Sequence, residues 1–374
     1  MNISSQFDGG NIIVDNTDNP EKIRLRIRDD SESQFKQWFH FRASVQTGVE
    51  YRFEITNAGE CSYADAWDGY RAVASYNRKD WFRVPTEYRD GVLSICHRPA
   101  QPVVFYAYFA PYPYERHLDL VHEAMASAYC HLHTLGQTVQ GRNIDYLKIG
   151  TPGAGKKNVW VIARQHPGET MAEWCAEGLL KRLLDPADAV AAAVREHCVV
   201  HFVPSMNPDG GALGNLRANA AGVNLNRAWL EPDADTSPEV WYVRQAMFDT
   251  GVDAFLDLHG DEAIAYNFIA GSEGVPGYTP RLAELEKRFK EKLLAVTPEF
   301  QLEHGYPLVA AGEADMRIAG NWVAQEFNCL ALTVEMPFKD NLQLPEQESG
   351  WSPVRCQRFG GNLLEPLLDI LPVL

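Results

Sequence analysis

The segment NVWVIARQHPGET, residues 158–170, decides the fold class that the sequence predicts. Residues 158–163 form a short apolar strand pattern, and residues 170–184 form an amphipathic helical pattern that closes at Asp185-Pro186. Between them lies a tight turn that contains Pro167 and Gly168. A strand that runs through a short turn into a helix is the repeating unit of α/β proteins.

The same alternation continues on both sides of this segment. We expect further helices at residues 117–135, 237–250 and 280–296, and further strands at residues 198–203, 254–258 and 329–334. This pattern predicts a mixed, largely parallel sheet flanked by helices. In such sheets the chemistry gathers beyond the carboxyl ends of the strands.

The first part of the chain has a different pattern. Apolar and polar side chains alternate at residues 37–45 and 51–55, and residues 103–109 form another strand-like run. Short strands without a long helix predict an antiparallel β-sandwich. The Pro/Tyr-rich residues 111–114 mark the predicted boundary, so we expect a β-sandwich domain at residues 1–114 and an α/β domain at residues 115–374.

Composition restricts the function classes. The 374 residues carry a formal net charge of −16, which argues against general binding to nucleic acid. The seven cysteines form no C-x-x-C pair and are typical of thiols in a reducing compartment. No secretory signal and no apolar run of membrane-spanning length is visible, so we expect a cytoplasmic protein without a membrane partner.

Three side chains suggest a metal site at the strand ends. His166 and Glu169 flank the Pro-Gly turn, although an H-x-x-E pair alone is common by chance and also fits a solvated loop. His259 follows the predicted strand at residues 254–258. Two imidazoles and one carboxylate would give a catalytic zinc ion three protein ligands and leave one position open for water.

Other residues could complete such a site. Glu335 ends an apolar strand, where a carboxylate is costly unless it is paired or functional, and it is placed to act as a general base. Arg217 and the pair Asn226 and Arg227 could bind a carboxylate or a developing oxyanion. Each arginine alone would also fit an ordinary surface ion pair.

Taken together, these motifs resemble the M14 family of zinc carboxypeptidases, with H-x-x-E, an Asn-Arg pair, a distal His and a late Glu in the family's order. The sequence is most similar to the cytosolic carboxypeptidase branch. Residues 37–41, 70–76 and 111–114 resemble patterns of that branch outside the active site, so the resemblance covers nearly the whole chain.

The resemblance implies a zinc-dependent metallocarboxypeptidase that hydrolyses the C-terminal peptide bond of peptides or proteins. It assigns one zinc ion to His166, Glu169 and His259, the general base to Glu335, oxyanion stabilisation to Arg217, and the terminal carboxylate to Asn226 and Arg227. The branch is associated with removing glutamate. We therefore hypothesise that Arg317 contacts an acidic side chain of the released residue.

Two features depart from the family pattern. Asn224 stands where the family usually has an Asp that orients a zinc-binding His, so the hydrogen bond would lack a full charge. The digestive relatives also use a mobile Tyr. Only Tyr266, Tyr278 and Tyr306 lie between His259 and Glu335, and none of them stands in a matching sequence context.

Two alternatives remain open from the sequence. A zinc deacylase of the aspartoacylase or succinylglutamate desuccinylase type would use the same kind of ligand set on a small metabolite. A non-catalytic protein that recognises C-termini would be expected to lack a ligand or the base, and none is missing here. The sequence does not predict the oligomeric state.

Overall fold

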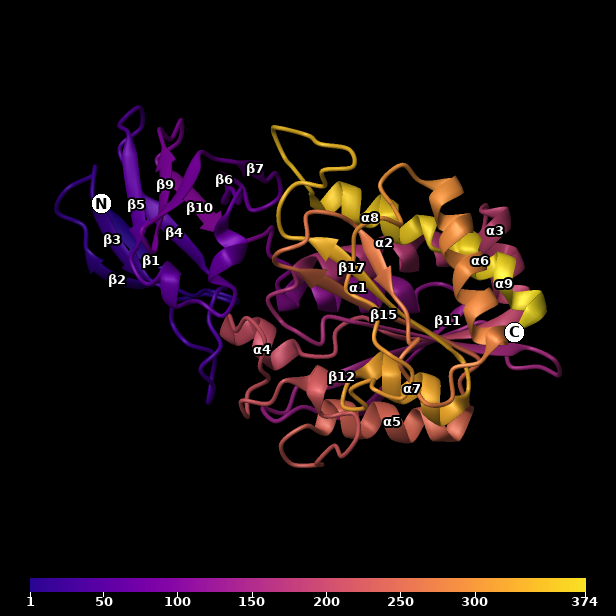
Figure 1. Ribbon diagram of the computed structural model, residues 1–374. Coiled ribbons are helices and arrows are strands. Elements are labelled where there is room, and N and C mark those ends of the chain that lie inside the picture. The colour runs from indigo at the N-terminus through magenta and orange to yellow at the C-terminus, as the bar shows by residue number, and fades with distance from the viewer.

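The computed structural model describes residues 1–374, and Figure 1 shows an N-terminal β unit beside a larger layer of helices and strands. We call residues 2–107 the sandwich unit. One of its sheets has the strand order β1 (Asn2–Ser4), β4 (His40–Ser44), β10 (Val103–Ala107), β6 (Val73–Ser75) and β7 (Phe82–Arg83). The other has the order β2 (Ile13–Asn16), β3 (Ile23–Arg26), β5 (Tyr51–Ile55), β9 (Val92–His97) and β8 (Thr86–Arg89).

The two sheets pack through the apolar positions that alternate along the strands. Phe41 of β4 lies 5.6 Å from Phe53 of β5, and Phe53 lies 4.9 Å from Tyr106 of β10, measured between ring centroids. All three side chains are fully buried. The predicted antiparallel sandwich is confirmed, and only the β3–β5 pair is parallel.

A seven-stranded sheet forms the centre of the larger part. Its order is β11 (Cys130–Gln137), β12 (Asn143–Ile149), β14 (Cys198–Val203), β13 (Lys157–Ala163), β15 (Ala254–Asp261), β17 (Leu330–Pro337) and β16 (Phe268–Ala270). The four strands β14, β13, β15 and β17 are parallel, whereas β11, β12 and β16 pair antiparallel. The predicted mixed, largely parallel sheet is therefore confirmed.

Helices cover both faces of this sheet (Figure 1). One face carries α1 (Tyr114–Met125), α2 (Thr170–Leu184), α3 (Ala189–His197), α6 (Pro280–Val296), α8 (Pro353–Asn362) and α9 (Leu364–Ile370), and the other carries α5 (Pro238–Thr250) and α7 (Ala319–Phe327). Along β13, Val159, Val161 and Ala163 face the first layer, while Trp160 and Ile162 face the second. Because successive side chains point to opposite faces, a continuous apolar strand serves both layers.

The helix predicted at residues 117–135 is wrong in its second half. α1 ends at Met125, and β11 begins at Cys130 as an edge strand paired only with β12. The exposed pattern of β11 explains the error, because one open edge and a mostly exposed surface leave no apolar alternation to detect.

The chain between the two units is buried. Tyr108 stacks on Phe338 at 4.4 Å between ring centroids, and Tyr112 packs edge-on against Trp174 at 4.8 Å. The boundary at residues 114 and 115 stays a prediction, since the hydrophobic core runs across it without interruption. Among the helices, none has both the length and the apolar composition needed to span a membrane.

Candidate active site

The three predicted metal ligands lie together at the carboxyl edge of the central sheet. His166 follows β13, Glu169 immediately precedes α2, and His259 lies in β15. Their ligand atoms are all within 4.8 Å of one another. Nδ1 of His166 is 2.6 Å from Glu169 Oε1, and Nδ1 of His259 is 2.8 Å from Glu169 Oε2. All three side chains are buried, so polar groups from distant strands converge where water is scarce.

A locked turn holds His166 and Glu169 in place. Arg164 adopts a positive φ of 58°, and its guanidinium donates to Pro167 O at 2.9 Å and to Glu173 Oε2 at 2.6 Å. At Gly168 a Cβ would meet Leu216 O at 2.9 Å, so only glycine fits there without a shift of backbone. The short Pro-Gly turn therefore depends on contacts that the motif itself does not reveal.

Neighbouring polar groups orient both imidazoles. Nε2 of His166 lies 3.1 Å from Asn224 Oδ1, and Nε2 of His259 lies 3.0 Å from Asp257 Oδ2. Gln165 donates to the same Asp257 oxygen at 2.6 Å. With Nε2–H donated outward, each ring presents the lone pair of Nδ1 to the shared point. Asp257 was missed in the sequence, although it lies two residues before His259 on the same strand face.

The electrostatics fit a cation. Burial alone would raise the pKa of Glu169, but positive charge beside it, which His166 and His259 supply when they are protonated, outweighs burial and holds that pKa well below its usual range. Burial, with help from the charge of Arg217, lowers the pKa of His166 to about 4. Two inward Nδ1 atoms and a carboxylate form the donor set that zinc prefers, so these residues fit the ion that the family uses.

Glu335 lies beside this cluster at the end of β17. It is paired with His259 in the β15–β17 register. Its Oε2 atom is buried and has no hydrogen-bond partner. Burial and the nearby carboxylates of Glu169 and Asp261 raise the pKa of Glu335 to about 8. A buried carboxyl with a free oxygen and a raised pKa is suited to proton transfer.

Tyr306 is a residue that the sequence did not single out. Its hydroxyl lies 2.8 Å from Asp261 Oδ2 and 3.2 Å from Glu335 Oε1. The ring packs edge-on against Phe268 at 4.9 Å between centroids. The only sign in the sequence was its position, because Tyr306 is one of three tyrosines between His259 and Glu335.

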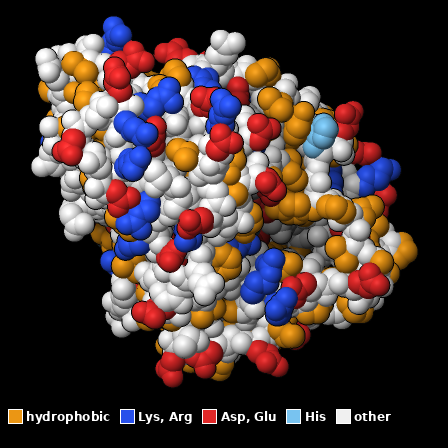
Figure 2. All heavy atoms as spheres, turned by 60° about the vertical axis from the view of Figure 1, so that its left-hand side comes forward, with side chains coloured by type: hydrophobic (Ala, Val, Ile, Leu, Met, Phe, Trp, Pro, Cys, Tyr) orange, Lys and Arg blue, Asp and Glu red, His pale blue; other side chains and the backbone are white.

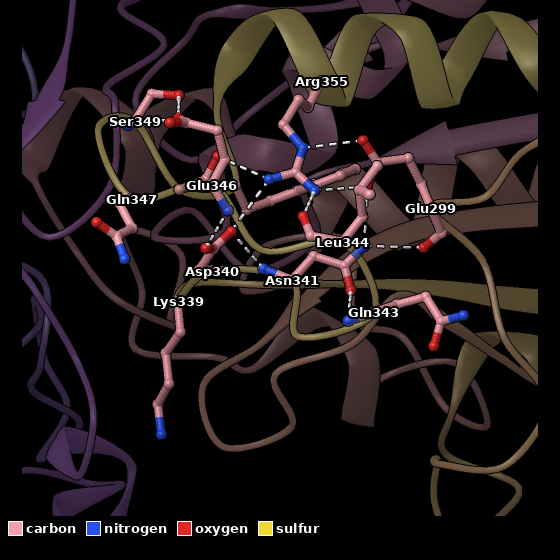
Figure 3. A network of polar contacts seen from close by, with 12 residues as sticks. Glu299, Lys339, Asp340, Asn341, Gln343, Leu344, Glu346, Gln347, Ser349 and Arg355 are labelled. Carbon is pink, nitrogen blue, oxygen red and sulfur yellow. Dashed lines mark hydrogen bonds and ion pairs between the residues drawn. The ribbon is translucent and has the colours of Figure 1, made fainter.

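A network of polar contacts anchors the segment that leads to Tyr306 (Figure 3). Arg355 donates to both carboxylate oxygens of Glu299, at 2.9 and 2.6 Å, and to Asp340 at 3.0 Å. Asn341 donates to the backbone oxygen of Glu299 at 2.9 Å. Two residues later, the side chain of Gln301 accepts from the backbone N–H groups of residues 303 and 304, at 2.7 and 2.6 Å.

The predicted arginines take different positions. The guanidinium of Arg217 lies next to the cluster, with Nη1 4.0 Å from Glu169 Oε1. Arg227 lies in the short 3-10 helix η3 (Leu225–Arg227) and is half-buried. Asn226 is buried, and its Oδ1 accepts from the backbone N–H of Ala319 at 2.9 Å. Arg317 is exposed and forms an ion pair with Asp315 at 2.8 Å.

A cavity of about 960 Å³ joins most of these residues. Its lining includes His166, Glu169, Arg217, Asn226, Arg227, Tyr306 and Glu335, but not Arg317. Beyond the cluster it extends between β16 and α6, with Ile269, Glu273 and Glu286 among the lining side chains. Figure 2 shows a hollow in the surface that hydrophobic side chains border, with Lys or Arg side chains beside it.

This combination of fold and buried two-His, one-Glu cluster is that of a metallohydrolase. The chain belongs to the M14 family of zinc carboxypeptidases, whose family model matches residues 114–353. A second model, for the cytosolic carboxypeptidase N-terminal domain, matches residues 3–109. The predicted family, branch and enzyme class are confirmed, which decides against the deacylase and the non-catalytic alternatives.

Several relatives resemble the chain over most of its length. A metallo-carboxypeptidase from Pseudomonas aeruginosa, solved in complex with (2-guanidinoethylmercapto)succinic acid, is 48% identical with a TM-score of 0.98, and the match covers 100% of this chain and 99% of that one. A metallo-carboxypeptidase from Burkholderia cenocepacia is 44% identical with a TM-score of 0.98 and full coverage of both chains. Human cytosolic carboxypeptidase 6 is 28% identical over 77% of this chain, which spans 61% of the human protein.

Proposed function

We propose that this enzyme holds one zinc ion through His166, Glu169 and His259 and removes the last residue from peptides or proteins. The observation that carries the proposal is the convergence of three buried ligand groups within 4.8 Å, beside the free carboxyl oxygen of Glu335. A zinc ion bound there would polarise the scissile carbonyl and make a water molecule more acidic.

Glu335 is the proton-transfer group in this proposal. Its buried Oε2 atom has no hydrogen-bond partner, so this oxygen is free to accept a proton from a water molecule. It takes a proton from the attacking water and returns it to the nitrogen of the leaving amino acid. The hydroxyl of Tyr306, 3.2 Å from Glu335 Oε1, can steady that carboxyl and contact the substrate backbone.

Arg217 and Arg227 contact different negatively charged groups of the substrate. Arg217 has no carboxylate partner closer than 4.0 Å, so its guanidinium is free to stabilise the oxyanion that develops on the scissile carbonyl. Asn226 and Arg227 bind the terminal carboxylate of the substrate. A cation placed one residue beyond the scissile bond selects a free C-terminus and makes the enzyme an exopeptidase.

The proposal extends to the released residue. Asp315 contacts Arg317 at 2.8 Å and Arg227 at 3.8 Å, so Arg317 lies near the residue that would bind the terminal carboxylate. We assign to Arg317 a preference for a terminal glutamate. The guanidino ligand of the Pseudomonas relative makes a basic terminal residue the competing outcome.

The decisive experiment incubates the zinc-loaded enzyme with a peptide library and identifies by mass which terminal residues disappear. Loss of single C-terminal residues from free peptides, with amidated copies untouched and no loss after chelation, is the expected result. Internal cleavage or cleavage of amides would refute the exopeptidase assignment.

A second experiment tests the role of Arg317 in selecting the released residue. If an Arg317→Ala variant keeps the preference for a terminal Glu over a terminal Gln, that role is refuted. Arg281→Ala, on α6, is the control variant.

A further inference from the structure

Arg217 lies on a segment with no regular secondary structure. Residues 214–224 connect α4 (Pro208–Leu213) to η3, and no sheet or helix ladder fixes their backbone. Two contacts tie the segment to the proposed metal site: the N–H of Gly168 donates to Leu216 O at 2.8 Å, and Asn224 Oδ1 lies 3.1 Å from Nε2 of His166. The direction of the Arg217 side chain therefore depends on what else holds residues 216–218.

The carboxylate of Asp30 holds that backbone. Asp30 lies between β3 and β4 in the sandwich unit, which Figure 1 shows beside α4. Its Oδ1 accepts the N–H of Leu216 at 2.6 Å, and its Oδ2 accepts the N–H groups of Arg217 and Ala218 at 2.7 and 2.9 Å. Asp30 is 4% exposed, so three charge-assisted hydrogen bonds form away from water, where they are strongest.

Further contacts hold residues 30–32 of the sandwich unit against residues 214–224. Oδ1 of Asn215 accepts from the backbone N–H of Ser31 at 3.1 Å, and its Nδ2 donates to Ala218 O at 3.0 Å. At Gly222 a Cβ would lie 2.3 Å from Glu32 O, so the two backbones touch there. The segment that carries Arg217 is thus shaped by the sandwich unit rather than by the central sheet.

Aromatic rings of the sandwich unit also support the guanidinium. The centroid of the Tyr63 ring lies 5.5 Å from Cζ of Arg217, and that of the Phe35 ring lies 5.9 Å away. An aromatic face attracts a cation without occupying its hydrogen-bond donors in the plane of the guanidinium. Arg217 is therefore held in position while its N–H groups stay available for a substrate oxygen.

We infer that the sandwich unit belongs to the catalytic apparatus, and that Asp30 is the positioning residue that aims Arg217 at the reacting carbonyl. Phe35 and Tyr63 complete this support through the side chain. The inference rests on the proposed role of Arg217 as the oxyanion-stabilising group, and it adds a specific task for a unit that lies outside the zinc-ligand sequence motifs.

The test compares Asp30→Asn with Asp29→Asn in the full-length, zinc-loaded enzyme. Asn is nearly isosteric with Asp but turns an NH₂ group or an uncharged oxygen towards the three N–H donors. Asp29 is the neighbouring residue, with an exposed side chain that pairs with Lys36. We expect Asp30→Asn to lower kcat by about 10- to 100-fold with KM within about twofold, because misplacing an oxyanion donor weakens only the transition state. Asp29→Asn should match the wild type.

A double-mutant cycle separates positioning from general damage. If Asp30 acts through Arg217, then Asp30→Asn should lower kcat by less than about twofold in an Arg217→Ala background. Equal losses in both backgrounds, or a fall in bound zinc that parallels the fall in kcat, would overturn the inference. If Arg217→Ala itself leaves kcat unchanged, the proposed function of Arg217 fails instead.

Phe35→Leu gives an independent measurement if Asp30→Asn does not fold. Phe35 is only half-buried, so its replacement leaves the core of the sandwich unit intact. Loss of a cation–π contact of about 0.5–1 kcal/mol corresponds to a two- to fivefold fall in kcat. An unchanged kcat for Phe35→Leu, with Arg217→Ala impaired, would contradict the proposed support of the guanidinium.

Discussion

We expect His117 to make this enzyme less stable at alkaline pH than at neutral pH. The imidazole of His117 in α1 lies between two buried carboxylates, with Nδ1 2.9 Å from Glu173 Oε1 and Nε2 3.0 Å from Asp145 Oδ2. Burial alone would lower the pKa of His117, but the two carboxylates outweigh burial and raise it to about 9. Glu173 also binds Arg164, so this network supports the turn that carries His166 and Glu169.

The magnitude follows from the difference between the folded and ordinary pKa values of His117. A rise of about 2.5 in pKa corresponds to about 3 kcal/mol of unfolding free energy, since one pKa unit is worth about 1.4 kcal/mol. Because the folded pKa is the higher one, this contribution is fully present below about pH 6.5. It is lost progressively as the pH rises through about 9.

The assay is urea unfolding, followed by circular dichroism, at pH 6, 7.5 and 9.5 with zinc present. The unfolding free energy of wild type minus that of His117→Gln should be largest at pH 6 and smaller by about 3 kcal/mol at pH 9.5. Taking the difference cancels other groups that titrate in this range. His122→Gln, an exposed position on the same helix, should show no such trend. A difference that stays constant from pH 6 to 9.5 would refute the reasoning.

Four further outcomes are expected. Glu335→Gln should lower kcat by about a thousandfold or more while the zinc content, measured by metal analysis, stays at the wild-type level. Arg227→Ala should raise KM for free peptides about tenfold or more and reduce the discrimination against amidated peptides in paired assays. Asn224→Asp, which places a full charge 3.1 Å from His166 Nε2, should tighten zinc binding about tenfold in a chelator competition. Arg355→Met leaves Glu299 and Asp340 without their common partner, so it should cost about 3–5 kcal/mol in urea unfolding.

The sequence predicts those helices and strands whose apolar residues are buried at regular spacing. The strand at residues 158–163 and the helix at residues 170–184 lie within β13 and α2, because buried apolar residues flank a turn that glycine and proline define. His166, Glu169, His259 and Glu335 could be found for the same reason, since each one stands at or near the end of such a strand or turn. Their roles as ligands and base stay predictions that zinc analysis and kinetics must test.

Loop residues escape this kind of reasoning. Tyr306 lies in a stretch without helix or strand between Phe300 and Ile318, where no periodicity marks one tyrosine from another. The sequence likewise gave no sign that the exposed side chain of Arg317 pairs with Asp315, and its role towards a terminal glutamate stays a prediction. In both cases the direction of a side chain is set by tertiary contacts, and a sequence motif carries no information about them.

Asp30 shows why the sandwich unit could not be assigned a task from the sequence. It acts on backbone N–H groups, which every residue but proline offers, so nothing at residues 216–218 identifies the acceptor. The partners are also more than 180 residues apart in the chain. A carboxylate whose partners are main-chain atoms leaves no complementary side chain to find, and only the folded structure shows that the β-sandwich and the α/β layer both shape the site around Arg217.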